Sequence, residues 1–470
     1  MASAAVDLVV VGAGPAGLAA SLSAARRGLD VMLVEAAERV GGMAASFEIA
    51  GQRVDLGSHR LHPAASPRVL DLLRSLLGDD LQTRSRRGRI RLDDRWVHFP
   101  LDPVDLLVSA RPRFALRAGF DLATGPLRRA RHESYAEVIR AGLGPTALKA
   151  FHRPMAAKLW GRDPDELAAE LAYKRVSVRS GRSLVSTVVA GRSSPPTFLY
   201  PRLGFGQIAD VLAEAAAEAG VDLRLSSNVR SIEGDSPAVT TVVAGQDGSD
   251  HKVTARRVLW TAPAEQAAAA CGTGAGAGGV PHRAMTLVYP VASTRGGAPS
   301  YTPYDAHYVP QPDVVFSRLS EPRNYRDGPD PDGLTVLCAE IPCDRDDALW
   351  NADDGELTDL VLDGIDRLGL PPPRMLDVAV RRLPRVYPVI DRRRANARAE
   401  LLAATERLPG VTVLGRHGRA AADNLHQVMD MALSAVDRLA TDRRRTDGTG
   451  WDDEGWRSDL DRFESFVVED

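Results

Sequence analysis

Cysteine is scarce in this 470-residue chain, with Cys271, Cys338 and Cys343 as an odd set that has no CxxC spacing. Such a set argues against a disulfide framework, a zinc site and an iron–sulfur centre. We therefore expect no metal site, and a reducing, cytoplasmic compartment fits the composition best. Lysine is also scarce, with four among the 59 basic residues, which we interpret as the codon bias of a GC-rich bacterial genome.

An excess of charge of one sign is missing too, because the formal net charge is −3 at pH 7. The chain therefore lacks the overall basic field typical of proteins that bind nucleic acid or anionic lipid. No apolar run reaches the roughly 18 residues of a membrane span, and the first apolar run lacks the positive segment that precedes a signal peptide core. We expect a small-molecule substrate, no nucleic acid and no membrane as partners, with a homodimer left open.

Hydrophobic residues, by contrast, make up 44% of the chain, enough for a large core divided between two or three domains. Residues 6–11 predict a buried strand, residues 14–27 a helix and residues 30–35 a second strand. Together they form one βαβ unit. The fold class that follows from this unit is α/β.

A glycine motif stands between the first strand and the helix, formed by Gly12, Gly14, Pro15, Ala16 and Gly17. Gly12 allows a tight turn, Gly14 lets the backbone approach a pyrophosphate, and Gly17 lets helix and strand pack closely. The helix N-terminus offers N–H groups and a favourable dipole to phosphates. Glu35 ends the second strand, where its carboxylate can accept hydrogen bonds from ribose hydroxyls. These features predict a dinucleotide site.

The remaining chain predicts helices first and strands later. Residues 67–78 and 103–148 predict helices, and we interpret the basic clusters from Arg111 to Arg131 as a solvated helical face rather than a phosphate-binding patch. Helices are also predicted at 207–219 and 424–440, with a flexible surface loop at 267–280. Strands are predicted at 221–225, 229–245, 252–260, 284–291, 314–319, 334–341 and 411–415.

The residues after Glu35 carry a family resemblance. They include Ala36, Glu38, Arg39, Gly41, Gly42 and Met43. This segment resembles the extended FAD motif of the amine oxidase and protoporphyrinogen oxidase superfamily. The resemblance implies FAD rather than NAD, with paired glycines at the flavin pyrophosphate and Arg39 over the adenine side.

Several later segments, in order, resemble UDP-galactopyranose mutase. They are residues 55–62, with Gly57, Ser58, His59 and His62; 160–167, with Trp160 and Arg162; 174–179, with Arg175; 316–321, with Arg318; 338–342, with Glu340; 387–391, with Tyr387; 414–416, with Gly415 and Arg416; and 423–428, with Asp423, Asn424, Leu425 and His426. Together these segments span most of residues 6–440.

The resemblance implies roles for these residues. The catalytic set would be His59, His62, Arg318 and Asn424. The later cofactor-binding set would be Gly57, Ser58, His59, Val229, Gly415, Arg416, Asn424, Leu425 and His426. The substrate-binding set would be Trp160, Arg162, Arg175, Arg318, Glu340, Tyr387 and Asp423. Structural roles stay open for some of these residues: loop caps for His59 and His62, core packing for Trp160, and surface ion pairs for Arg162 and Arg175.

The chain also departs from the mutase pattern. Two tyrosines that the family uses on the substrate diphosphate fall on Ala420 and Asp423, and the family's next aspartate is Asn424. An unscreened aspartate facing a diphosphate would repel it by several kcal/mol. The substrate or its mode of phosphate binding has therefore changed.

The resemblance implies an FAD-binding Rossmann-like domain of the GR2 type with an inserted α+β substrate domain and a helical region. We expect an interleaved FAD-binding domain from 1–65, 205–265 and 405–440. We expect a mainly helical substrate or lid region at 66–204, a β-rich substrate domain at 266–404, and a charged, loosely held tail at 441–470.

Two functions follow. The first is a mutase or isomerase that acts on a sugar or nucleotide sugar through N5 of the reduced flavin, without net redox change. The alternative is a dehydrogenase or oxidase of a sugar, cyclitol or amine, which the missing tyrosines favour. A non-catalytic FAD-binding protein is a third, minor alternative.

Overall fold

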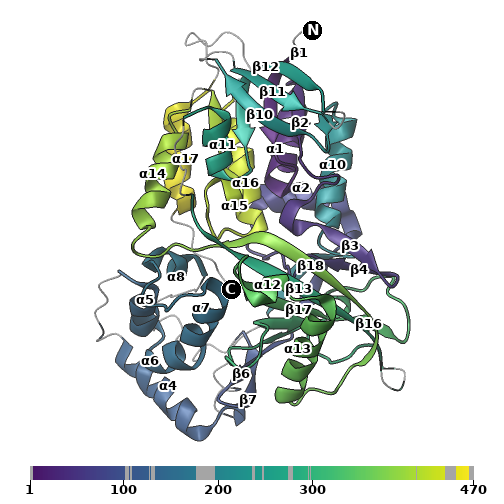
Figure 1. Ribbon diagram of the computed structural model, residues 1–470, viewed down its shortest axis with the longest axis vertical. Coiled ribbons are helices and arrows are strands. Elements are labelled where there is room, and N and C mark those ends of the chain that lie inside the picture. The colour runs from purple at the N-terminus through teal and green to yellow at the C-terminus, as the bar shows by residue number, and fades with distance from the viewer. Residues whose placement is uncertain are drawn as a thin grey trace.

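The computed structural model describes residues 4–100, 105, 108–125, 128, 133–175, 196–234, 239–245, 248–273, 279–294, 296, 298–408, 410–439 and 451–464. Figure 1 shows two sheets, one toward each end of the long axis, with a group of helices beside the second sheet.

The first sheet has the strand order β10-β11-β12-β1-β2-β9, and β19 pairs with β12. Its strands are β1 (Ala4–Val11), β2 (Val31–Val34), β9 (Asp222–Arg224), β10 (Asn228–Glu233), β11 (Val239–Ala244), β12 (Asp250–Trp260) and β19 (Val411–Val413). Because β1 pairs in parallel with β2 and with β12, the predicted βαβ unit is confirmed. The strands come from three separate parts of the chain, as an interleaved domain requires, while the domain limits stay a prediction.

Helices cover both faces of this sheet (Figure 1). Leu8 and Val10 pack on one face with α1 (Pro15–Ala25), α2 (Pro67–Leu77), α10 (Gln207–Glu218) and α16 (Leu425–Asp437). The alternate residues Val9 and Val11 pack on the other face with α11 (Ala264–Ala270) and α14 (Ala395–Thr405). This alternation follows from the two-residue repeat of a strand. Because α1 begins shortly after β1 ends, the start of α1 lies at the carboxyl end of β1.

The second sheet has the strand order β16-β13-β17-β15-β14-β6-β7, and β18 pairs with β13. Its strands are β6 (Gly88–Leu92), β7 (Arg95–Phe99), β13 (His282–Ser293), β14 (Ala306–Tyr308), β15 (Arg318–Ser320), β16 (Leu334–Val336), β17 (Cys338–Cys343) and β18 (Arg374–Pro388). Helix α13 (Asp354–Arg367) packs on one face, and α12 (Ala348–Asn351) lies nearby. Two small strand pairs, β3 (Ser46–Ile49) with β4 (Gln52–Asp55) and β5 (Leu81–Ser85) with β8 (Thr197–Pro201), complete the strands.

The β6–β7 hairpin lies in the region that was expected to be mainly helical. Burial alternates along Gly88–Leu92, and the turn residues Asp93 and Asp94 both have positive φ, 47° and 62°. Two positive φ values in a two-residue loop match the twist of a hairpin, and aspartate tolerates them better than most residues. This local signal could have predicted the hairpin.

The helical region consists of α4 (Pro112–Thr124), α5 (Tyr135–Gly142), α6 (Pro145–Ala147), the π-helix η4 (Leu148–His152), α7 (Arg153–Trp160) and α8 (Ala169–Arg175). The predicted helix over 103–148 is therefore interrupted. Gly144 has φ +93° and Pro145 starts the next turn, because proline can begin a helix but cannot continue one. The predicted strand 314–319 is likewise only partly formed, since β15 begins at Arg318.

Part of the tail also differs from expectation. Residues Asp453–Glu464 form α17, and its Trp456, Leu460 and Phe463 are buried in the same core as α16. Arg438 near the end of α16 pairs with Asp452 and Asp459, at 3.0 Å and 2.8 Å. This part of the tail is therefore packed against the first domain rather than loosely held. The predicted loop 267–280 likewise begins inside a helix, because α11 extends to Ala270.

Candidate active site

A cavity of about 1630 Å³ extends from the glycine motif of β1–α1 into the helical region. The sequence-predicted residues on its wall are Gly12, Gly14, Pro15, Ala16, Glu35, Ala36, Gly42, Met43, Gly57, Ser58, His59, His62, Trp160, Val229, Arg318, Glu340, Tyr387, Gly415, Arg416, Asp423, Asn424 and Leu425. Gly17, Arg39, Gly41, Arg162 and His426 do not line it. One cavity thus brings together most of the predicted cofactor and substrate residues.

The glycine motif has the backbone geometry of a dinucleotide site. Gly12 has φ +100°. A Cβ added to Gly17 would lie 1.9 Å from the carbonyl oxygen of Gly12, whereas one added to Gly14 would meet no atom within 4 Å. Gly17 therefore allows helix and strand to pack, while Gly14 leaves open space beside the N-terminus of α1. A pyrophosphate fits this space.

Glu35 and the second glycine pair lie on the same side of the cavity. The carboxylate of Glu35 accepts hydrogen bonds from the N–H groups of Ala13 and Ala37, at 2.7 Å and 2.9 Å. Gly41, with φ +110°, donates its N–H to the carbonyl of Ala13 at 2.8 Å, which brings Gly42 against Gly14. Arg39 is exposed outside the cavity wall.

The C-terminal motif borders the cavity next to the glycine motif, because a Cβ added to Gly415 would lie 3.5 Å from the Cβ of Ala16. The short helix α15 (Gly415–Gly418) follows β19, and Asn424 caps the N-terminus of α16 in a capping box with Gln427. Arg416 donates to the carbonyls of Asp423 and Val386 at 2.7 Å and 2.9 Å. The free N–H groups at this helix start can stabilise negative charge in the cavity.

The loop of residues 57–60 is fixed by a buried ion pair. Arg318 donates to both carboxylate oxygens of Glu340, at 2.6 Å and 2.8 Å, and also to the carbonyl of Ser58 at 3.1 Å. Glu340 accepts the N–H of Ser58 at 2.8 Å. The pair thus holds the peptide groups on both sides of Ser58 and positions the adjacent His59.

The surroundings of His59 favour the neutral form of its imidazole. Burial lowers its pKa, although the carboxylates of Asp55 and Glu340 oppose this effect. Its Nε2 lies 3.1 Å from the carbonyl of Leu56, and its ring stacks on Phe205. His62 accepts the N–H of Ala64, which keeps a loop-capping role open beside its place on the cavity wall. His426 faces His62 from behind the wall, and burial lowers its pKa to about 4.

The end of the cavity inside the helical region is mainly apolar. Its wall includes Ile90, Leu92, Phe99, Phe114, Ala118, Leu143, Phe151, Met155 and Leu159. Trp160 borders this end and is 2% exposed, and its indole Nε1 has no hydrogen-bond partner among the described residues. A buried donor without a partner is costly, and this N–H has almost no accessible surface, so the indole packs in the wall rather than presenting its N–H to the cavity.

Two arginines between the two ends are neutralised by buried carboxylates. One is Arg318, paired with Glu340. The other is Arg60, which donates to Asp305 at 3.0 Å and to the hydroxyl of Tyr308 at 3.1 Å. The sequence analysis did not identify Arg60 as a site residue, although Arg60 lies between His59 and His62.

Two further residues predicted to bind substrate, Arg162 and Arg175, are not among the described residues on the cavity wall. Arg162 donates to the carbonyl of Gly161 and does not border the cavity. Arg175 ends α8, and its side chain lies outside the described residues. Asp423 is 4% exposed, and it accepts a hydrogen bond from Lys174 in α8.

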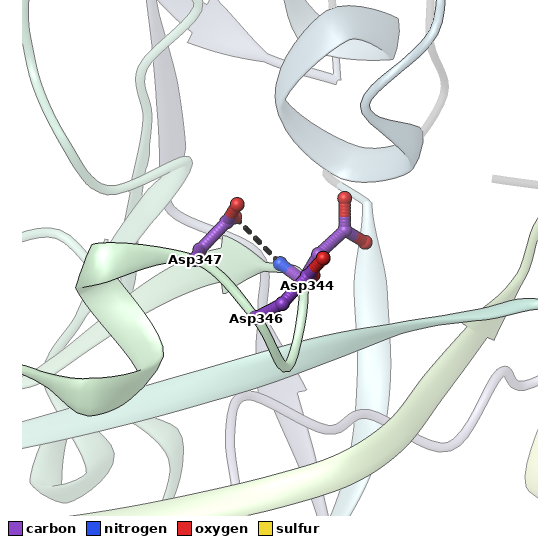
Figure 2. A group of neighbouring side chains, drawn as sticks. All are labelled: Asp344, Asp346 and Asp347. Carbon is purple, nitrogen blue, oxygen red and sulfur yellow. Dashed lines mark hydrogen bonds between the residues drawn. The ribbon is translucent and has the colours of Figure 1, made fainter.

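A separate acidic turn has three carboxylates that are close enough together to hold a metal ion (Figure 2). Oxygens of Asp344, Asp346 and Asp347 lie within 4.8 Å of one another, and Asp347 accepts the N–H of Asp344 at 2.6 Å. Arg283 lies 2.5 Å from Asp344 and 3.8 Å from Asp347. This arginine and the turn hydrogen bond account for the cluster without a metal.

The mixed sheet with parallel strands around β1, the glycine motif beside α1 and the returning helix α16 define a flavin-dependent enzyme with FAD as its cofactor. The chain belongs to the family described as flavin containing amine oxidoreductase, whose profile matches residues 15–276. The resemblance to the amine oxidase superfamily is therefore confirmed.

Individual relatives extend the comparison. A Mycobacterium tuberculosis protein named as flavin-containing monoamine oxidase AofH is 28% identical over 249 residues, which are 50% of this chain and 53% of that protein. The chain thus spans about half the length of this relative. Coproporphyrinogen III oxidase of Propionibacterium freudenreichii subsp. freudenreichii is 26% identical over 423 residues, covering 76% of each chain.

The fold is also similar to that of a solved structure, reduced UDP-galactopyranose mutase, with a TM-score of 0.77. The two sequences are 18% identical, and the match covers 99% of this chain and 100% of the mutase. This likeness shows a shared fold.

Proposed function

We propose that the chain is an FAD-dependent dehydrogenase or oxidase whose substrate has a large apolar part. The observation that carries this proposal is the apolar end of the cavity, which is continuous with the glycine motif. Aromatic and aliphatic side chains there can bury an apolar molecule and exclude water from the reacting atoms. FAD, when bound, supplies an acceptor for the hydride of a substrate C–H bond.

The chain's own groups would hold both molecules. Gly12, Gly14 and Gly42 would face the pyrophosphate, and Glu35 the ribose. The start of α16 would stabilise negative charge near the flavin. On the substrate side, the loop held by Arg318 and Glu340 would keep His59 in place.

Two arginines of the cavity are already neutralised, which argues against a nucleotide sugar. Arg318 and Arg60 each face a buried carboxylate, and Arg86, at the apolar end, lies over the ring of Phe99 at 4.6 Å. The two mutase tyrosine positions are Ala420, which is buried in the core beneath the first sheet, and Asp423, which pairs with Lys174. Replacing two hydroxyls with a methyl group and a carboxylate removes donors that a diphosphate needs.

The second candidate is a redox-neutral mutase or isomerase that acts on a sugar substrate. It is favoured by the fact that His59 and Arg318, which the mutase resemblance assigns to catalysis, border the same cavity as Trp160, which it assigns to substrate binding. Under this candidate the protein requires reduced flavin and produces no net oxidation.

An anaerobic titration separates the two candidates. Oxidised, FAD-loaded protein is mixed with apolar amines, isoprenoids, fatty acids and porphyrinogens, and separately with nucleotide sugars, and the flavin absorption is recorded. We expect bleaching by an apolar compound together with its dehydrogenated product. Isomerisation of a nucleotide sugar by dithionite-reduced protein, without bleaching by any apolar compound, would overturn the proposal in favour of the mutase.

A further inference from the structure

Helix α4 forms an outer edge of the molecule, at the lower end of Figure 1, and its two faces differ in an unusual way. Phe114 and Ala118 line the cavity, and Ala115 is buried. On the outer face, Leu116 is 74% exposed and Phe120 is 69% exposed. The sequence pattern had suggested that apolar residues of this segment would point inward and basic residues outward.

The exposed apolar residues alternate with arginines along one stripe. Arg113, Leu116, Arg117 and Phe120 have the spacing i, i+3, i+4, i+7, which places them on one face of a helix. We call these four residues the docking stripe. Val108, before the start of the helix, is also exposed, at 79%.

The arginines of the docking stripe are unpaired within the described part of the chain. Neither Arg113 nor Arg117 forms an ion pair there, whereas the nearby Arg111 lies 3.4 Å from Asp94 and Arg128 lies 3.1 Å from Asp121. The stripe therefore combines two free cations with two large apolar side chains. An exposed apolar patch of this kind marks an interaction site rather than a solvated face.

We propose that the docking stripe binds the surface of an anionic lipid bilayer. Leu116 and Phe120 can enter the boundary between headgroups and acyl chains while Arg113 and Arg117 contact lipid phosphates. A second copy of the chain fits less well, because a two-fold contact through this stripe would gather four unpaired arginines in one interface.

This binding is peripheral, since among the described helices none combines the length and apolar character of a bilayer span. The proposed binding differs from the expectation of no membrane partner. That expectation rested on the net charge of the whole chain, which does not reveal a local group of arginines and apolar residues. The inference does not depend on which reaction the cavity supports. It would, however, place the wall formed by Phe114 and Ala118 next to a bilayer.

Vesicle flotation of the FAD-loaded protein tests the proposal. At low salt we expect the protein to float with phosphatidylglycerol-rich vesicles and to remain unbound with pure phosphatidylcholine vesicles. The variant Leu116→Ser/Phe120→Ser should lose most of this binding. The variant Arg113→Gln/Arg117→Gln should lose roughly fivefold per arginine. Flavin absorption and melting temperature confirm that each variant is folded.

Leu376→Ser is the matched control, because Leu376 is 60% exposed but lies on β18 of the second sheet. It should float like the unmodified protein. The proposal is overturned if anionic vesicles do not bind the protein, or if the stripe variants bind as well as the control. It is also overturned if the stripe variants change only the oligomeric state in size-exclusion chromatography, which would identify a second copy as the partner.

Discussion

Lys174 donates from Nζ to Oδ1 of Asp423 at 3.0 Å, and both side chains are buried. The same Nζ donates to the carbonyl of Phe463 in α17 at 2.9 Å. One cation thus ties α8, the segment before α16 and the C-terminal helix together. It also explains how the carboxylate of Asp423 can lie beside the cavity, because its charge is compensated inside the protein.

Removing this cation should be costly. Lys174→Met leaves the carboxylate of Asp423 buried without a partner, so we expect the free energy of unfolding to fall by about 3–5 kcal/mol. The double variant Lys174→Met/Asp423→Leu removes both charges and should recover most of that loss. Denaturant unfolding measures both variants.

An exposed pair provides the control. Arg224→Met breaks the ion pair with Asp222, whose side chains are 56% and 44% exposed, and should cost less than about 1 kcal/mol. A Lys174→Met variant as stable as this control would show that the buried pair does not hold the three segments.

Replacing glycine by alanine at two positions of the glycine motif should have two different effects, one on FAD affinity and one on stability. Gly14→Ala places a methyl group in open space, so the apoprotein should keep its melting temperature while its affinity for FAD falls. Gly17→Ala places a methyl group against the carbonyl of Gly12, so the apoprotein itself should be destabilised. Flavin fluorescence titration and thermal unfolding of apoprotein separate the two effects. Unchanged FAD affinity in Gly14→Ala would exclude close approach of the pyrophosphate at this position.

The ion pair beside His59 should matter more for rate than for binding. Glu340→Gln removes the counterion of Arg318 and the charged acceptor of the Ser58 N–H. We expect the rate of flavin reduction to fall roughly tenfold to hundredfold because the His59 loop shifts, while the apparent Kd of the substrate changes little. Stopped-flow absorption measures both. A raised Kd with an unchanged rate would instead indicate that the pair binds substrate directly.

Acid should destabilise the protein in a defined range. Burial lowers the pKa of His152 from 6.5 to about 4. Between these two pH values the imidazole is therefore protonated in the unfolded chain and neutral in the folded chain. The stability from neutral His152 is fully present above pH 6.5 and is lost as the pH falls toward 4, by up to about 3 kcal/mol.

The variant His152→Phe tests this origin of the pH dependence. It should lose less stability between pH 6.5 and pH 5 than the unmodified protein, although loss of the contact with Tyr135 lowers its overall stability. Unfolding midpoints at matched pH values provide the comparison. Parallel pH profiles for both proteins would assign the acid sensitivity to other groups.

The nucleotide end of the site was predictable because its signals are local. Gly12, Gly14 and Gly17 encode a turn, a close approach and a packing contact within a few residues. The apolar end was not predictable, because Phe114, Phe151 and Leu159 have the helical spacing of ordinary core residues. Only the tertiary arrangement decides which apolar residues line a cavity and which fill a core.

The charge partners show the same limit at longer range. Lys174 and Asp423 are 249 residues apart, and Arg60 and Asp305 are 245 residues apart. Nothing near either residue in the sequence indicates its partner. The β6–β7 hairpin was missed for a different reason. The Asp93–Asp94 turn and the alternating burial before it are local signals, but the whole region 66–204 was expected to be mainly helical.

A single-turnover experiment without oxygen tests the proposed function most directly. Oxidised protein is mixed with the compound that bleaches its flavin, and reduced flavin and product are counted together. The proposal predicts one dehydrogenated product for each flavin reduced. A product isomeric with its substrate, formed only by prereduced protein and with no change in flavin oxidation state, would contradict it.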